Sequence, residues 1–246
     1  MTQHRKRLSI IKRLSPTAFV FDPMSKEDFI DIADTCGAYW MHSGDLAEPH
    51  AMLMTGLCSN GYLNMMKVLQ YPNLSQILAR QIINTLPTDI DLGRVDWILG
   101  SAYTATGLSK DIANLLGKQW VPLQKNSYGK QICGHAYFTQ EETILHVEDV
   151  FTTGKSLLSV REAIRQVQPI INILHPVPVI VFRPSCSNSS ETLAPIVLHP
   201  LFQFNEFWVT QQNECTLCQQ GSKPLKPKAN WSLFSNAQGD NRCTGQ

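Results

Sequence analysis

The segment 144–157, ILHVEDVFTTGKSL, restricts the fold more than any other part of the sequence. Its apolar first half is typical of a strand buried on both faces, and its second half opens an amphipathic stretch with helical spacing. Two adjacent acids, Glu148 and Asp149, stand where the strand ends. Ligands of parallel α/β sheets bind at the carboxyl ends of the strands, so we expect a binding site at this acidic pair.

The turn after the acids has the composition of an anion site. Backbone amides and the positive end of the following helix attract phosphate, a glycine permits the positive φ of a tight loop, and hydroxyls add donors. The predicted phosphate-binding residues are Thr152, Thr153, Gly154, Lys155 and Ser156. Two carboxylates beside a phosphate can bind the hydroxyls of a sugar and a shared magnesium ion, which assigns Mg²⁺ to Glu148 and Asp149.

Two other interpretations of this turn stay open from the residues alone. The string Gly-Lys-Ser also belongs to the nucleotide-binding P-loop, but that motif requires a glycine five residues before Gly154, where Asp149 stands. The turn could also be an ordinary strand-to-helix loop with a capping threonine. Such a loop does not require two consecutive acids at the end of a buried strand.

The rest of the chain alternates predicted strands and helices. We predict helices over 25–36, 73–86, 107–117 and 156–167, and strands over 95–100, 119–125, 143–150 and 171–182. This alternation predicts an α/β fold with a parallel sheet and right-handed crossovers. The stretch 37–62 is expected to form loops and short strands of a substrate hood.

Beyond Ser185 the chain becomes polar and irregular. We expect one strand within 206–211 and a loose cover from Gln219 onward. The predicted domains are an N-terminal arm and hood over 1–70, a ligand-binding α/β core over 71–185, and a C-terminal hood and tail over 186–246.

Composition limits the class of protein. The 246 residues, 43% of them hydrophobic, can bury a sizeable core, and 21 Lys and Arg against 20 Asp and Glu leave a net charge of +1. We therefore expect neither a nucleic-acid partner nor a membrane partner. Seven scattered cysteines, an odd number in a long chain, favour a reducing cytoplasm. The basic residues among the first fourteen are expected on a surface arm or short helix.

The segment 144–157 resembles the phosphoribosyl pyrophosphate signature of type I phosphoribosyltransferases, and its Glu-Asp order is similar to that of bacterial orotate phosphoribosyltransferases. The resemblance implies a Rossmann-like parallel core with a small hood formed by the N-terminal and C-terminal segments. It implies transfer of ribose 5-phosphate from phosphoribosyl pyrophosphate to a small planar base, with orotate expected. It also implies a homodimer that depends on magnesium and serves pyrimidine biosynthesis.

Three further segments resemble the same family. The segment 51–64, AMLMTGLCSNGYLN, is similar to its substrate loop, and 96–113, DWILGSAYTATGLSKDIA, is similar to its pyrophosphate loop. The resemblance implies base contacts from Thr55, Gly56, Ser59 and Tyr62, and pyrophosphate contacts from Gly100, Ser101, Ala102 and Tyr103. In 179–185, VIVFRPS, it implies that Arg183 faces the carboxylate of orotate.

A loop over 125–135 resembles the mobile loop of the family. The resemblance assigns catalysis to Glu148 and Asp149 together with Lys125, and further pyrophosphate contacts to Lys130 and His135. As positive charge develops on the ribose, the two carboxylates can stabilise it. Closure of the loop would exclude water, which otherwise competes with the base.

Several departures from the family pattern keep alternatives open. The mobile loop is poor in basic residues, Lys155 stands where the family has a small residue, and Phe182 stands where it usually has an Asp. The pyrophosphate loop lacks the usual Pro after Gly100. The alternatives are a transferase for another base and a non-catalytic sensor of phosphoribosyl pyrophosphate or a nucleotide.

The pair Cys215 and Cys218 lies in 214–228, ECTLCQQGSKPLKPK, which resembles the ending of one bacterial branch of the family. The pair offers two of the four ligands of structural zinc, and no second pair follows it, so zinc within one chain is not expected. Completion of the site across a dimer, a redox role and simple packing stay open. His146 is interpreted as a core residue with a satisfied ring.

Overall fold

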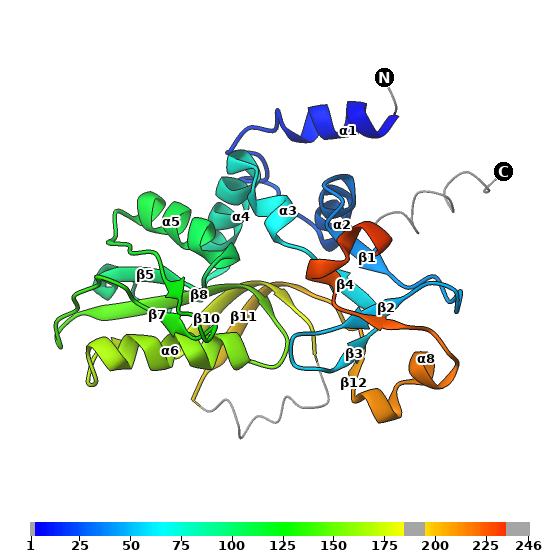
Figure 1. Ribbon diagram of the computed structural model, residues 1–246. Helices are drawn as coiled ribbons and strands as arrows, with labels where there is room; N and C mark the ends of the chain where they lie inside the picture. The colour runs from blue at the N-terminus through cyan, green and yellow to red at the C-terminus, as the bar shows by residue number, and fades with distance from the viewer. Residues whose placement is uncertain (1–2, 185–194, 235–246) are drawn as a thin grey trace.

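The structure, a computed structural model of the chain, describes residues 3–184 and 195–234. They form a larger body around a parallel sheet and a smaller body, here called the hood, built from residues 39–63 and 205–234 (Figure 1). The hood combines blue and cyan segments from the beginning of the chain with orange and red segments from its end. The hood therefore joins an early segment of the chain to its last described segment.

The parallel sheet holds five strands in the order β11–β10–β8–β5, with β9 pairing with β8. The strands are β5 (Trp97–Gly100), β8 (Thr143–Phe151), β9 (Asn172–Ile173), β10 (Pro176–Phe182) and β11 (Val197–Gln203). All of the described pairings in this sheet are parallel, and Glu148 of β8 stands opposite Val179 of β10. The carboxyl ends of the strands therefore share one edge, as predicted for an α/β core.

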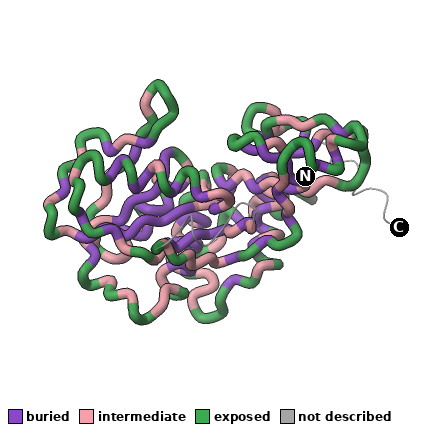
Figure 2. Tube along the Cα trace, turned by 90° about the horizontal axis from the view of Figure 1, so that it is seen from below, coloured by how far each residue is buried: buried purple, intermediate pink, exposed green. Residues whose placement is uncertain are grey.

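Helices cover both faces of this sheet. α4 (Pro72–Thr85) and α5 (Thr104–Leu116) lie on one face and α6 (Lys155–Val167) on the other (Figure 1). Figure 2 shows the buried stretches of the strands running through the larger body. α5 ends at Gly117, whose left-handed φ of +64° is the conformation that glycine favours at a helix end. The predicted helices over 73–86, 107–117 and 156–167 are confirmed.

The N-terminal helices pack against the larger body. α2 (Lys26–Thr35) confirms the predicted helix, and Ser25 begins it with a capping box in which the Asp28 amide donates to Ser25 Oγ at 3.0 Å. α1 (Gln3–Ile11) confirms the expected short helix, and Arg7 forms an ion pair with Asp31 of α2. α3 (Met66–Leu69) and η1 (Leu92–Arg94) are short connections.

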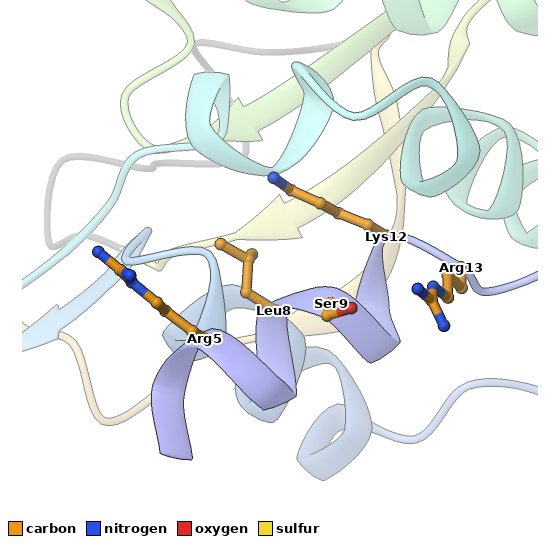
Figure 3. Close-up of a pocket in the computed structure, with 5 residues that line it drawn as sticks. All are labelled: Arg5, Leu8, Ser9, Lys12 and Arg13. Carbon is orange, nitrogen blue, oxygen red and sulfur yellow. The ribbon is translucent and has the colours of Figure 1, made fainter. Parts of the chain in front are cut away.

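A surface hollow follows α1 and the turn after it (Figure 3). It is lined by Arg5, Leu8, Ser9, Lys12 and Arg13. All of these residues come from one segment, and none belongs to the predicted ligand site. Within 3–184 and 195–234, no helix combines the length and the apolar character needed to cross a membrane.

The hood consists of short strands. β1 (Tyr39–Met41) pairs with β4 (Gly61–Leu63), and a second sheet has the order β12–β3–β2–β13. Its strands are β2 (His50–Met52), β3 (Cys58–Ser59), β12 (Val209–Thr210) and β13 (Pro224–Leu225). Its helical turns are η2 (Gln212–Glu214), α8 (Thr216–Gln219) and η3 (Pro227–Ala229). The short strands predicted within 37–62 are confirmed, and β12 is a shorter form of the strand predicted within 206–211.

The strand predicted over 119–125 is wrong. Only Gln119 bridges to Trp97 of the main sheet, and the chain then leaves it, since Pro122 has no N–H for a ladder. The end of the segment forms β6 (Gln124–Lys125), which pairs with β7 (Gln131–Ile132) in an antiparallel hairpin.

Two C-terminal features differ from the expectation. β11 extends the main sheet, although the predicted core ended at 185; its sequence VLHPLFQ contains a proline, which an edge strand tolerates. The tail from Gln219 is not a loose cover as far as residue 234. β13 pairs with β2, and the buried Phe234 ring lies 4.7 Å from that of Trp40. The contacts of the tail depend on partners that are distant in the sequence.

Candidate functional site

The carboxyl end of β8 presents an open helix N-terminus. Gly154 precedes α6 with φ +79°, a left-handed conformation that a residue with a side chain rarely adopts. Gly154 has no side chain with which to cap α6, so the first-turn amides can bind an anion. Around them Thr152 and Thr153 are half-buried, while Lys155 and Ser156 are exposed. The five predicted phosphate-binding residues therefore form one loop, with hydroxyls and one cation beside the amides.

Glu148 is anchored inside the protein. Its carboxyl group is buried, with Oε2 accepting from Ser101 Oγ at 2.7 Å and Oε1 lying 3.0 Å from His146 Nε2. Ser101 follows β5 and His146 belongs to β8, so the acid is held by two neighbouring strands. His146 is fully buried, as interpreted, and its Nε2 has a partner, while its Nδ1 has none among the described residues. Glu148 is thus a fixed, preoriented group.

Asp149 has a different environment. It is half-buried, and burial together with the neighbouring Glu148 raises its pKa to about 7. Tyr62 of the hood lies close to Asp149. Burial, and after it the charge of Asp149, raise the pKa of the Tyr62 hydroxyl to about 12. The positive charge of Lys228, from η3 of the hood, lowers the pKa of Asp149. Asp149 therefore lies where the core meets the hood.

The predicted pyrophosphate loop follows β5. A side chain at Gly100 would collide with the backbone oxygen of Ala105, so only glycine lets α5 approach the strand this closely. The Ala102 amide donates to Gln131 Oε1 at 3.1 Å, and Lys125 Nζ lies 5.7 Å from the ring centroid of the exposed Tyr103. These contacts dock the β6–β7 hairpin on the loop.

The predicted base-binding residues divide into two groups. Ser59 and Tyr62 lie in β3 and β4, close to Arg183, whereas Thr55 and Gly56 are exposed at the turn between β2 and β3. Arg183 Nη2 donates to Ser59 Oγ at 2.7 Å and to the Gly61 carbonyl at 2.9 Å. Arg183 is almost fully buried, which lowers its pKa to about 10. Its guanidinium therefore joins the core to the hood, and its Nε has no partner among the described residues.

The chain was compared with known proteins. No family model matches it. The orotate phosphoribosyltransferase of Desulforamulus reducens is 31% identical over 205 residues, which cover 83% of this chain and 97% of the relative. The chain belongs to the orotate phosphoribosyltransferase family.

Other comparisons agree with this membership. The orotate phosphoribosyltransferase of Caldicellulosiruptor bescii is 30% identical over 183 residues, covering 74% of this chain and 90% of the relative. The crystal structure of the orotate phosphoribosyltransferase from Aeropyrum pernix shares the fold, with a TM-score of 0.53 and 18% identity over 70% of this chain and 92% of that chain. The predicted family and its α/β fold are therefore confirmed.

For a member of the orotate phosphoribosyltransferase family, the structure adds residues that sequence reasoning missed. Gln131 fastens the hairpin to the pyrophosphate loop, His146 lies against Glu148, and Lys228 faces Asp149. In the sequence, His146 stood out only as a polar residue inside an apolar strand. Lys130 and His135, predicted to contact pyrophosphate, are exposed in and after the hairpin. Gln131 and Lys228 gave no comparable signal, because their partners are distant in the sequence.

Proposed function

We propose that the chain transfers ribose 5-phosphate from phosphoribosyl pyrophosphate to orotate, forming orotidine 5′-monophosphate and releasing pyrophosphate. One observation carries this proposal: the Ser101–Glu148 hydrogen bond joins the pyrophosphate loop to the acidic pair beside an open helix N-terminus. Membership of the orotate phosphoribosyltransferase family supports orotate as the base.

The loop before α6 would bind the 5-phosphate. Amides of the first turn offer donors and the positive end of the helix dipole, and the hydroxyls of Thr152, Thr153 and Ser156 can add hydrogen bonds. Lys155 is exposed at the first helical position, so its ammonium group can reach a bound phosphate. Gly154 keeps the loop tight enough for its amides to converge.

The acidic pair would act on the ribose. As the bond from the anomeric carbon to pyrophosphate breaks, positive charge develops on the sugar, and the fixed carboxylate of Glu148 supplies preorganised negative charge. Asp149 would accept hydrogen bonds from the ribose hydroxyls. A bound ligand that donates to Asp149, or brings a cation to it, favours its ionised form and lowers its pKa from about 7.

The residues present fit a magnesium ion, because carboxylate oxygens are the donors it prefers. Both oxygens of Glu148 already have partners, so Asp149 is the better placed of the two to hold Mg²⁺. When bound, magnesium would neutralise charge on the pyrophosphate leaving group.

The leaving pyrophosphate would lie between the loop from Gly100 to Tyr103 and the β6–β7 hairpin. Lys125 is already over Tyr103, while Lys130 and His135 are exposed and can turn toward an anion. The base would lie against Tyr62 and Ser59, with Thr55 and Gly56 at the rim. Arg183 would position this wall through Ser59 and Gly61.

We further propose a homodimer in a reducing cytoplasm. Seven cysteines, an odd number scattered along the chain, support a reducing compartment. Light scattering on the purified chain would test the dimer; a mass of one chain at working concentration would contradict it.

The decisive experiment measures pyrophosphate release from phosphoribosyl pyrophosphate and Mg²⁺ with orotate and a panel of other bases. We expect release with orotate, and a loss of at least about 100-fold in kcat/KM in Asp149→Asn. Asp89→Asn, at an exposed position outside the site, is the matched control and should match wild type. Release with a different base and not with orotate would show that the acceptor is that base. Tight binding without release would identify a non-catalytic sensor.

A further inference from the structure

The hood contains a cluster of three cysteines and one histidine. The ligand atoms of His50, Cys58, Cys215 and Cys218 all lie within 4.8 Å of one another. His50 lies in β2, Cys58 in β3, Cys215 just before α8 and Cys218 within it, so an early and a late segment of the chain supply two ligands each. From the sequence we expected no zinc within one chain, because the Cys215–Cys218 pair offers only two ligands; the structure brings His50 and Cys58 to the pair as two further ligands.

The distances between these atoms match a tetrahedral metal centre. With zinc–sulfur bonds of about 2.3 Å and a zinc–nitrogen bond of about 2.0 Å, tetrahedral angles place two sulfurs about 3.8 Å apart and a sulfur and a nitrogen about 3.5 Å apart. Cys58 Sγ and Cys218 Sγ are separated by 3.7 Å. His50 Nε2 lies 3.3 Å from Cys218 Sγ and 3.6 Å from Cys215 Sγ.

The ring of His50 is held in the tautomer that a metal needs. Ser222 Oγ donates its proton to the Glu48 carbonyl at 2.8 Å, so it must accept in its 2.9 Å hydrogen bond with His50 Nδ1. His50 therefore carries its proton on Nδ1, which leaves the lone pair of Nε2 directed at the sulfurs. Such a second partner on a histidine ligand is usual at zinc sites.

We propose that His50, Cys58, Cys215 and Cys218 bind one zinc ion that folds the hood. Three thiolates and one imidazole complete four-coordinate zinc and leave no position for a substrate, so the site is structural. His50, Cys58 and Cys215 are buried, and Cys218 is half-buried. A Cys58–Cys218 disulfide would use two of these ligands and leave Cys215 and His50 without a role.

The location explains what the metal would do. The described segment 211–223 buries few apolar side chains, with Cys215 and Leu217 as its buried hydrophobic residues, so it has little core of its own. A metal centre would fasten this segment to β2 and β3. Cys58 directly precedes Ser59, the residue that Arg183 contacts. The same centre would therefore also hold Ser59 in place.

The first test measures metal on the full-length wild-type chain, purified under reducing conditions after growth with added zinc. We expect about one zinc per chain by elemental analysis. Replacement by cobalt should give the sulfur-to-cobalt charge-transfer bands of a tetrahedral thiolate site. A chain that holds no zinc and gives no such bands would overturn the proposal, as would a Cys58–Cys218 disulfide persisting under these reducing conditions.

A matched pair of variants locates the ion. Cys218→Ala removes the least buried ligand, whereas Cys133→Ala removes a buried cysteine of the core outside the cluster. We expect Cys133→Ala to keep its zinc, and Cys218→Ala to lose most of it and to melt at least about 5 °C lower. Stripping zinc from the wild type should reproduce that shift, and refilling should reverse it.

An equal zinc content in both variants would overturn the assignment. If Cys218→Ala fails to fold, the cobalt spectrum of the wild type still decides. Neither zinc content, cobalt spectrum nor melting temperature requires transferase activity, so failure of the zinc proposal and failure of the transferase proposal are separate results.

Discussion

The parallel sheet and the hood are stabilised in different ways. β8 buries six consecutive residues from Thr143 to Glu148 between two layers of helices, so apolar burial stabilises it. The hood strands are two or three residues long and come from an early and a late segment of the chain. Such strands have little independent stability, and the hood depends on Arg183, aromatic contacts and the proposed zinc.

The core and the hood therefore have different roles in the proposed site. In the proposed function, the core would supply the phosphate and sugar positions at strand ends, whereas the hood brings Tyr62 and Lys228 close to Asp149. The acidic pair lies at the junction. Four substitutions, each with a matched control, test whether the core and the hood have these separate roles.

The largest expected change in stability is at Asp149, because burial and the neighbouring Glu148 make its ionised carboxyl group unfavourable. In the unfolded chain this carboxyl ionises near 3.8, but in the folded, ligand-free chain only near 7, so folding opposes ionisation. The resulting loss of stability is absent below about pH 4, grows as the pH rises between the two values and is complete above about pH 7. Asp149→Asn should therefore raise the free energy of unfolding by about 4 kcal/mol at pH 8.

Urea unfolding at pH 4 and pH 8, without magnesium or substrate, measures this effect. The gain should be small at pH 4. Asp89→Asn, exposed on a loop, should show no comparable gain. Equal stability of Asp149→Asn and wild type at pH 8 would mean that Asp149 is not strained by its place between core and hood.

The same contrast decides what could be predicted from the sequence. The apolar run before Glu148 and the turn at Gly154 are local patterns, so β8, α6 and the phosphate loop followed from them. The segment 119–125 misled because Trp120, Val121 and Leu123 give it the apolar character of a strand, while Pro122 prevents a full ladder. His50 and Cys218 are 168 residues apart, and no local pattern links them.

A second prediction concerns the fit between β5 and α5. Gly100→Ala puts a methyl group against the Ala105 backbone, and the helix must move, which should cost about 2 to 3 kcal/mol and lower kcat/KM by displacing the pyrophosphate loop. Gly107→Ala, within α5 and with free space around it, should instead stabilise the chain by about 0.5 to 1 kcal/mol. Thermal unfolding of both variants tests this, and a neutral Gly100→Ala would refute the close approach.

A third prediction tests the junction itself. Arg183→Met removes the two buried hydrogen bonds that its guanidinium donates to Ser59 Oγ and the Gly61 carbonyl, at a cost of about 2 kcal/mol. Arg161, a buried arginine that donates to the Leu174 carbonyl within the core, is the control. Hydrogen exchange should accelerate in β3 and β4 for Arg183→Met, with a raised KM for the base, but not for Arg161→Met. Faster exchange confined to the main sheet in Arg183→Met would contradict the assigned role.

The smallest expected effect is at Gln131, which fastens the hairpin to the pyrophosphate loop. Gln131→Leu leaves the buried Ala102 amide without its acceptor, which should cost about 1 kcal/mol. Gln81 is a close match: it is buried, accepts from the Met24 amide at 3.1 Å and donates to the Phe19 carbonyl at 2.7 Å, far from the site.

Both leucine variants should lose similar stability, but only Gln131→Leu should raise the KM for phosphoribosyl pyrophosphate, by about 3- to 10-fold. Steady-state kinetics alongside urea unfolding separates the two effects. An unchanged KM in Gln131→Leu would mean that the hairpin does not organise the pyrophosphate loop, and the phosphate sites would then depend on β5, β8 and α6 alone.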